Sequence, residues 1–325
     1  MARVNPFAPL YEIQNSGTVE TKARDIPAFP RLIDVELTSL CNFRCVMCPT
    51  GLLALKRPSG FMSVATFMGI VAECSGYGTA LRLIGWGEPT LHPNVVDFVR
   101  AAGKVGLLTH INTNASKITP GLAEALVDAG LSSIKFSFQG TDHDTYAEMR
   151  QTPFFAGMLR AIEMMRNARA TAALPFIAAS TSTTYETAEQ IETFRAMMEP
   201  LVDHLSIGKT TFDYIDQTMI RVKPEQFEQF VRLMGEESLD KQHPDPCSEV
   251  WDKLSIAWDG TGRVCCNDAT GETDLGKIGE ATIEQMWHHP VIEAYRERLA
   301  RKEYTGPLCQ SCYTYMDLTP PRSAA

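Results

Sequence analysis

Three cysteines near the start of the chain are the feature that most limits how it can fold. Cys41, Cys45 and Cys48 follow each other at spacings of four and three residues, directly after an alternating apolar run over residues 33–37 that predicts a β-strand. A structural zinc site normally takes four protein ligands, and no fourth cysteine is close in sequence. Three thiolates would instead leave one iron of a 4Fe-4S cluster open to a non-protein ligand. The alternative is that the thiols share one helix face and are buried as small hydrophobes.

The spacing Cys-x3-Cys-x2-Cys after a first strand resembles the signature of the radical S-adenosylmethionine (SAM) enzymes. In that family the three cysteines hold a 4Fe-4S cluster and SAM occupies the open iron, so the resemblance implies both cofactors. The family usually has an aromatic residue just before the third cysteine, where this chain has Met47. This difference leaves the three ligands unchanged and alters only the packing beside the cluster.

The composition is that of an ordinary soluble globular protein. The 325 residues are 44% hydrophobic and 21% charged, which suits one large and one smaller domain. A net charge of -9 argues against a nucleic-acid binder, which usually carries a basic surface. No apolar run approaches the roughly 18 to 20 residues that cross a bilayer, and no signal peptide is recognisable. We therefore expect a cytoplasmic protein without membrane contact, whose nine cysteines are metal ligands or free thiols.

Short apolar runs alternate with helical stretches from residue 32 onward. This alternation predicts βαβ units and a parallel α/β sheet, closed or partly closed into a barrel. The expected strands cover residues 32–37, 80–85, 106–111, 133–138, 176–180 and 204–207, with helices over 63–74, 94–104, 119–129, 155–169 and 186–198. The family resemblance implies the same partial (β/α)6 parallel barrel, and such barrels carry their chemistry at the C-terminal ends of the strands.

Changes of pattern divide the chain into four parts. Residues 1–30 are polar and contain several prolines, so we expect an N-terminal arm. Residues 31–218 form the expected radical SAM partial barrel core, and a helical segment over residues 219–240 forms a bridge. Residues 241–325 hold a second group of cysteines and form the expected small domain.

The end of the second expected strand carries a candidate SAM-binding turn. Its sequence, Gly85-Trp86-Gly87-Glu88-Pro89, is similar to the family's Gly-Gly-Glu-Pro element, with Trp86 in place of a glycine. Glycines let a backbone approach a ligand closely, and a carboxylate accepts hydrogen bonds from an ammonium group. The resemblance implies that this backbone and Glu88 hold the amino group of SAM, whereas an ordinary glycine-rich turn with an exposed acid is the alternative.

Polar residues at three further strand ends complete the expected SAM site. Asn114 lies in a segment similar to the family's Thr-Asn-Gly, with Ala115 in place of the glycine. Ser137 and Gln139 follow the fourth strand, where the family contacts the ribose or carboxylate of SAM, and Ser180 is expected to contribute from the fifth. Capping of the following turns is the alternative role for such side chains.

A cation, an acid and a phenol follow the sixth strand. Lys209, Asp213 and Tyr214 are expected at the mouth of the barrel, where they could bind hydroxyl-rich or anionic substrate groups or take up a proton. A solvated loop is the alternative, because charged residues are common on protein surfaces.

Four cysteines of the last part of the chain form a second candidate shell. Cys309 and Cys312 are a Cys-x2-Cys pair, and Cys247 and Cys265 complete a set of four thiolates. Residues 254–258 and 263–265 flank Asp-Gly-Thr-Gly and predict a β-hairpin. Four thiolates suit either a fully ligated 4Fe-4S cluster, which transfers electrons, or a structural zinc ion.

This second region resembles the C-terminal auxiliary-cluster domains called SPASM or, in shortened form, twitch. The full SPASM pattern has more cysteines after the hairpin and holds two clusters, so the resemblance is to the small one-cluster twitch-like α+β form. It implies a second 4Fe-4S cluster in preference to zinc. Cys266 is left over, and we expect either a buried thiol, a substitute ligand or a hydrogen-atom donor to a substrate radical.

The resemblance implies a radical SAM oxidoreductase. One electron, supplied by a partner such as flavodoxin or ferredoxin, splits SAM into methionine and a 5'-deoxyadenosyl radical that removes a hydrogen atom from a substrate C–H bond. A fully ligated auxiliary cluster favours an oxidative outcome, the dehydrogenation of a hydroxyl carbon. Twitch-type relatives include enzymes of aminocyclitols and other sugar-like small molecules. Peptide-modifying members often carry an N-terminal leader-binding domain, for which the arm is too short, so we expect a carbohydrate-like small molecule.

Three other hypotheses stay open on the sequence. Epimerisation would use Cys266 as the hydrogen donor, and a peptide-modifying maturase would bind a precursor peptide. A non-catalytic zinc-thiolate or electron-transfer protein belongs to a different class and would not cleave SAM.

Overall fold

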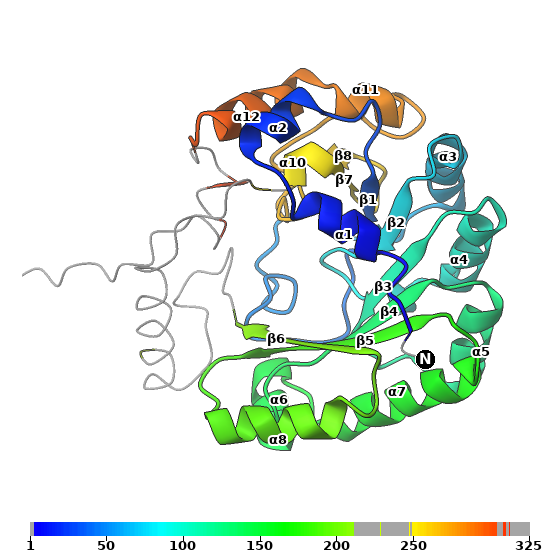
Figure 1. Ribbon diagram of the computed structural model, residues 1–325, viewed down its shortest axis with the longest axis vertical. Coiled ribbons are helices and arrows are strands. Elements are labelled where there is room, and N and C mark those ends of the chain that lie inside the picture. The colour runs from blue at the N-terminus through cyan, green and yellow to red at the C-terminus, as the bar shows by residue number, and fades with distance from the viewer. Residues whose placement is uncertain are drawn as a thin grey trace, which may run out of the picture.

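The computed structural model describes residues 3–210, 228, 247, 249–303, 308, 309 and 312. Within this part, one eight-stranded sheet runs in the order β6-β5-β4-β3-β2-β1-β7-β8 and curves into an open barrel (Figure 1). All neighbouring strands are parallel except β7 and β8. The strands are β1 (Leu32–Val35), β2 (Ala80–Leu83), β3 (Thr109–Thr113), β4 (Ser133–Ser137), β5 (Phe176–Thr183), β6 (His204–Lys209), β7 (Lys253–Ile256) and β8 (Gly262–Arg263).

Helices cover the outer face of the curved sheet, as expected for βαβ units (Figure 1). The described helices are α1 (Ala8–Gln14), α2 (Val19–Arg24), α3 (Val64–Ser75), η1 (Pro89–Leu91), α4 (Val95–Lys104), α5 (Pro120–Asp128), α6 (His143–Arg150), α7 (Phe155–Arg169), α8 (Ala188–Met198), α10 (Glu249–Asp252), α11 (Ile283–Trp287) and α12 (Pro290–Ala300). In the part of the chain that the structure covers, no helix has both the length and the apolar character to cross a membrane.

The six strands and five helices predicted for the barrel core are confirmed, and the differences are at their boundaries. β3 begins at Thr109 rather than 106, because Gly106, with φ 77°, forms the turn that follows α4. The sequence did not predict α6, although Asp142 and Thr145 form a capping box at its start, which is a recognisable helix signal. Apart from residue 228, the bridge over residues 219–240 lies outside the described residues.

The two faces of the sheet differ in chemistry, as strand alternation requires. Outward residues such as Ile33, Leu81 and Ile134 are fully buried against the helices in the main hydrophobic core. The alternate positions face the inside of the barrel and become polar above the strand starts: Asp34 pairs in register with Arg82, and Arg82 with His110. The interior therefore holds ionisable groups where many small barrels hold only apolar side chains.

The second cysteine region is built on the same sheet as the barrel. β7 pairs in parallel with β1, with Ile33 opposite Leu254, and the predicted hairpin is confirmed by the antiparallel pairing of β7 with β8. β8 ends at Arg263, earlier than predicted. The hairpin thus continues the barrel sheet beyond β1, which fixes it relative to the first cysteine loop.

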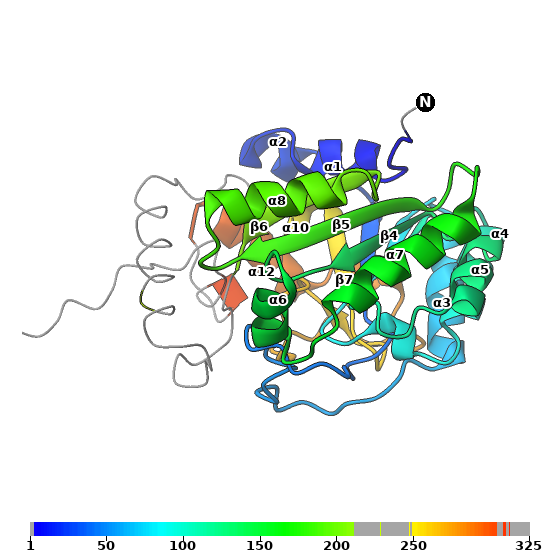
Figure 2. The same cartoon turned by 90° about the horizontal axis from the view of Figure 1, so that it is seen from below.

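The N-terminal arm closes the end of the barrel where the strands begin. In Figure 2, α1 and α2 lie on one side of the sheet and the long loop after β1 lies on the other. Phe7 is completely buried against Leu32 and Ala80, two inner positions at the strand starts, and its ring meets that of His110 edge-on at 5.7 Å between centroids. The Phe7 ring therefore fills the end of the barrel where the strands begin, here called the barrel floor, and acts as its plug.

Replacing the plug should destabilise the whole domain. We expect Phe7→Ala to lower the free energy of unfolding by about 3–5 kcal/mol, because it removes a large buried ring and leaves a cavity. Urea denaturation followed by circular dichroism measures the change. Val4→Ala, at a position 77% exposed in the same arm, is the matched control and should change little. Equal effects of the two substitutions would show that the arm does not support the barrel.

Candidate cluster-binding and active site

The first three cysteines lie in the loop between β1 and α3, at the C-terminal edge of the sheet. Cys45 is buried, and Cys41 and Cys48 are half-buried; all three are free thiols. Burial, and to a smaller extent the neighbouring Glu88, Cys45 and Cys48, raise the pKa of the Cys41 thiol to about 11. The three sulfurs are thus close enough to interact electrostatically, and metal ligation would have to displace their protons.

Close backbone packing holds this loop against the turn that follows β2. The Glu88 amide donates to the carbonyl oxygen of Leu40 at 2.8 Å, directly before Cys41. A Cβ at Gly87 would lie 2.1 Å from the carbonyl oxygen of Thr38, so only glycine fits there. Gly51, which the sequence reasoning did not single out, is equally constrained because a Cβ would lie 2.5 Å from the carbonyl oxygen of Cys45.

Glu88 is a buried junction between the turns after β2 and β3. Its Oε1 accepts hydrogen bonds from the Thr90 amide, the Thr90 hydroxyl and the Thr113 hydroxyl, and its Oε2 accepts one from the Asn114 amide at 2.7 Å. Burial raises the pKa of Glu88 and these hydrogen bonds oppose the rise. The exposed-acid alternative is excluded, since Glu88 is only 3% exposed. Contact with the amino group of SAM stays a prediction.

Asn114 extends the Glu88 junction to the first cysteine. Its Nδ2 donates to the Cys41 sulfur at 3.8 Å and to Asn42 Oδ1 at 3.0 Å. The next residue, Ala115, has φ 64°, the left-handed conformation in which glycine is unstrained. This explains physically why a glycine is usual at the equivalent position of the family motif.

The remaining strand-end residues separate into two kinds. Ser137 and Ser180 are opposite one another in the β4–β5 ladder and both are half-buried on the inner face, so they lie side by side as a SAM contact would require. Gln139 is buried and its amide donates to the Thr210 hydroxyl. Lys209 is the exposed last residue of β6, whereas Asp213 and Tyr214 lie outside the described residues.

Arg150 is a site residue that the sequence reasoning missed. It is the last residue of α6, and its guanidinium donates to the Cys45 sulfur at 3.5 Å and to the carbonyl oxygens of Ser137 and Phe138. A buried cation is thereby placed between the first cysteine loop and the end of β4. Only recognition of the capping box at Asp142 would have placed this arginine at a helix end facing the sheet.

Trp86 connects the candidate SAM-binding turn to the second cysteine region. Its indole Nε1 donates to the carbonyl oxygen of Cys266 at 3.0 Å, and its amide donates to Glu36 Oε1 at 3.1 Å. Glu36 is itself held by both terminal nitrogens of Arg57. The residue that replaces a glycine of the family motif thus forms a direct contact between two regions far apart in sequence.

The four predicted auxiliary ligands gather beside β8 and α12. Cys247 raises the pKa of Cys265, Cys312 raises that of Cys309, and Cys309 and Cys265 both raise the pKa of Tyr295, so these sulfurs share one neighbourhood. Burial is the largest cause of each shift.

The positions of the sulfurs do not decide between a cluster and zinc in this region. Among the described residues, the one group of three His, Cys, Asp or Glu ligand atoms within 4.8 Å of one another is that of Asp34, Glu249 and Cys266. Ligation by the four auxiliary cysteines stays a prediction.

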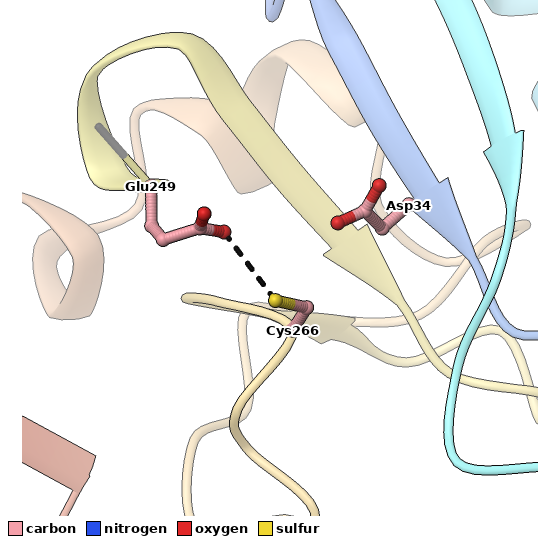
Figure 3. A group of neighbouring side chains, drawn as sticks. All are labelled: Asp34, Glu249 and Cys266. Carbon is pink, nitrogen blue, oxygen red and sulfur yellow. Dashed lines mark hydrogen bonds between the residues drawn. The ribbon is translucent and has the colours of Figure 1, made fainter. Parts of the chain in front are cut away.

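Cys266 faces the barrel interior. Its thiol donates to Glu249 Oε2 at 3.6 Å and lies near Asp34 (Figure 3). These two carboxylates are already paired, Asp34 with Arg82 and Glu249 with Lys253, so the group needs no metal ion. The cavity beside Cys266, bounded also by Trp86, is about 30 Å³, room for roughly one water molecule.

Comparison with known families identifies both regions. The radical SAM superfamily profile matches residues 35–178, and the SPASM iron-sulfur cluster-binding domain profile matches residues 247–313. The chain belongs to the radical SAM superfamily and has a C-terminal SPASM domain. The resemblance stated from the cysteine motifs is therefore confirmed, and these domains imply SAM and 4Fe-4S clusters as cofactors. The domain match, rather than the positions of the sulfurs, supports a cluster over zinc in the second cysteine region.

Curated relatives match only part of this radical SAM protein. It is 31% identical to an AdoMet-dependent heme synthase of Methanosarcina barkeri over 140 residues, which are 43% of this chain and 40% of the relative. It is 31% identical to a PqqA peptide cyclase of Rhodopseudomonas palustris over 130 residues, 40% of this chain and 33% of the relative. The chain thus matches well under half of the length of these relatives.

Solved structures share the fold at low sequence identity. The Streptococcus suis SuiB structure bound to S-adenosylmethionine superposes with a TM-score of 0.65 at 15% identity, over 95% of this chain and 78% of that one. BtrN in complex with AdoMet and 2-DOIA gives 0.55 at 17% identity, over 87% and 92% of the two chains. The predicted partial barrel with a small C-terminal SPASM-like domain is thereby confirmed.

Arg150 should tune the first cluster through its charge. We expect Arg150→Met to make the reduction potential of the SAM-binding cluster more negative, because a positive charge beside a ligand sulfur stabilises the reduced cluster. Potentiometric titration followed by electron paramagnetic resonance measures the shift. Arg150→Lys keeps the charge and should stay near wild type, and Arg166→Met on the exposed side of α7 is the control. An unchanged potential in Arg150→Met would show that the guanidinium does not influence the cluster and only holds the carbonyl oxygens of Ser137 and Phe138 in place.

Iron content should separate Cys265 from its neighbour Cys266. We expect the reconstituted protein to hold about eight irons per chain, since each 4Fe-4S cluster contributes four. Cys265→Ala should lose about four irons by removing an auxiliary ligand, whereas Cys266→Ala should keep both clusters. Iron and sulfide analysis checks this assignment. If only Cys266→Ala lost iron, Cys266 would be the auxiliary ligand and Cys265 the thiol outside the cluster.

Proposed function

We propose that this protein reductively cleaves SAM and oxidises a small, hydroxyl-bearing, carbohydrate-like molecule by hydrogen-atom abstraction. The observation that carries the proposal is the three-thiol loop at the C-terminal edge of the barrel, bound to the Glu88 and Asn114 junction. Cys41, Cys45 and Cys48 would hold a cluster able to supply the electron that breaks a carbon–sulfur bond of SAM. The four auxiliary cysteines would hold a second cluster able to accept the electron that the substrate radical gives up. A flavodoxin or ferredoxin is the expected reductant.

The residues of the chain would then position SAM and the substrate, shield the site from water and exchange protons with the substrate. Gly85, Gly87 and the ends of β3 to β5 offer backbone and short polar side chains to SAM, while Arg150 places a cation beside Cys45. Oxidation of a hydroxyl carbon also requires a base for the hydroxyl proton. Lys209, at the end of β6, stays a candidate for that base or for a substrate contact.

The hydrogen bond between Trp86 and Cys266 supports an oxidative outcome. It places the candidate SAM-binding turn in contact with the residue that follows the predicted auxiliary ligand Cys265. This contact brings the candidate SAM-binding turn close to the predicted acceptor of the electron that an overall two-electron oxidation must remove from the substrate radical. Epimerisation receives less support, because the Cys266 thiol already donates a hydrogen bond to Glu249 Oε2.

Peptide modification is the second candidate function. It is favoured by the similarity to PqqA peptide cyclases and by the fold shared with SuiB bound to its precursor peptide SuiA, with a TM-score of 0.63 at 17% identity. The two candidate functions require different substrates near the strand ends, a small sugar-like molecule for the first and a peptide for the second. Binding of a peptide longer than a few residues, in preference to sugar-like molecules, would support the second.

SAM cleavage is the first test of the proposal. The reconstituted, dithionite-reduced protein should release methionine and 5'-deoxyadenosine, and Cys45→Ala should release neither because it removes a cluster ligand. Deuterium carried from a labelled sugar-like substrate into 5'-deoxyadenosine would locate the attacked C–H bond. Absence of cleavage by the fully loaded wild-type protein would instead support a non-catalytic electron-transfer role.

A further inference from the structure

The inside of the barrel contains buried charges that are almost all paired. Asp34 is paired with Arg82, and Glu249 with Lys253, while Glu36 is paired with Arg57 at the strand ends. Each of these pairs is formed within hydrogen-bonding distance. Such pairing is required inside a protein, since an isolated buried charge loses its hydration without compensation.

Lys135 is the exception to this pairing. It lies on the inner face of β4, opposite Asn112 of β3 in the ladder. Its side chain is half-buried, and its ammonium makes no hydrogen bond or ion pair with any residue that the structure describes. Burial and the nearby Arg82 guanidinium lower the pKa of Lys135, which places two cations side by side.

The group around Arg82 therefore has an excess positive charge. Asp34 and Glu249 interact with Arg82 and Lys253, and Lys135 adds a third cation to two carboxylates. His110 does not compensate it, because burial lowers its pKa to about 3 and keeps the ring neutral. Its Nε2 is hydrogen-bonded to Asn112 Oδ1, while its Nδ1 is buried and has no hydrogen-bond partner in the described part of the chain.

A second unsatisfied polar atom faces the same interior. The Ser255 hydroxyl, opposite Asp34 on β7, is buried with no hydrogen-bond partner among the described residues and borders the water-sized cavity. Buried polar atoms are nearly always hydrogen-bonded, so two unsatisfied atoms, on β3 and β7, that face the same barrel interior as Lys135 indicate a place for a polar ligand. The floor beneath them is closed by the Phe7 ring packed on His110.

We propose that Lys135, with Arg82 beside it, binds an anionic oxygen group of the substrate, a carboxylate or a phosphate, inside the barrel between the Phe7 floor and the strand ends. This inference rests on the proposed function for its location, since it assigns to the substrate the interior of the barrel that would cleave SAM. It narrows the substrate class from a hydroxyl-bearing molecule to one that also carries a negative charge. An ammonium on a flexible stem beside a guanidinium is a suitable arrangement for such a group.

The depth of Lys135 argues for the substrate rather than the carboxylate of SAM. The predicted SAM contacts lie at or beyond the strand ends, whereas Lys135 lies two residues before Ser137, about 7 Å lower along the strand. Its electrostatic neighbours, Arg82 and His110, lie still nearer the floor. An anionic group held here would lie below SAM, with the rest of the substrate directed toward the strand ends.

Inorganic phosphate is the probe for this anion position. Its affinity for the cluster-loaded protein is measured from the rise in unfolding temperature, at ionic strength held constant with sodium chloride. We expect Lys135→Met to weaken phosphate binding at least about tenfold, as for the loss of one charged hydrogen bond. Lys104→Met, at an exposed lysine of α4, carries the same change of net charge and should bind phosphate as wild type does.

The unfolding temperatures of wild type and Lys135→Met without phosphate give a second test, in which a lysine with only a structural role would behave differently. Removing an uncompensated buried charge should raise the unfolding temperature of Lys135→Met above that of wild type in the absence of phosphate. Lower stability of Lys135→Met, or equal phosphate affinity of Lys135→Met and Lys104→Met, would overturn the inference.

A measurement of SAM binding distinguishes a carboxylate of the substrate from the carboxylate of SAM as the group that Lys135 binds. If Lys135 binds the substrate, SAM affinity measured by equilibrium dialysis should be the same in wild type and Lys135→Met, and phosphate should not compete with SAM. A tenfold loss of SAM affinity in Lys135→Met would overturn the inference and assign Lys135 to SAM. If the protein cleaves SAM normally but phosphate binding does not depend on Lys135, this inference is wrong and the proposed function stands. If phosphate binding depends on Lys135 but SAM is not cleaved, the proposed function is wrong and the anion site stands.

Discussion

The site depends on one buried carboxylate, that of Glu88. It accepts hydrogen bonds from Thr90, Thr113 and Asn114, and its own amide donates to Leu40, so three separate chain segments meet at one residue. A buried carboxylate without such donors would be costly to desolvate, and the fold can keep it only while the turns after β2 and β3 stay in place. The first cysteine loop takes its position from this junction. Cluster geometry is thus a consequence of sheet geometry rather than of the cysteines alone.

A second consequence is that the two cysteine regions are held by the same sheet. β7 extends the barrel from β1, and Trp86 crosses from the β2 turn to the carbonyl of Cys266. The family profiles match these regions separately, but here they share one sheet and a hydrogen bond. Relative motion between β1 and β7 would break backbone pairing, so the hairpin that precedes Cys265 is held in place beside the barrel.

The sequence predicted the fold well because apolar periodicity and strand-end motifs are local signals. The first cysteine motif and the Gly87 turn are recognised from residue spacing together with the family resemblance, and the hairpin from its turn residues. Arg150 and Lys135 are not singled out, because their surroundings come from distant parts of the chain: the Cys45 sulfur for Arg150, and for Lys135 the lack of a counter-charge among the described residues. Glu88 shows the same limit, since its identity as an acid was clear but its burial depends on neighbours distant in sequence.

The N-terminal arm does more than close the barrel floor. Phe7 seals the interior beneath His110, while farther along the arm Lys22 pairs with Asp252, and the carbonyl oxygens of Pro27 and Ala28 bond to Trp287 and His288. One continuous segment of about twenty residues therefore touches both the floor of the barrel and the helices that follow the second cysteine hairpin. A spectroscopic label placed on the arm would lie between these two contacts.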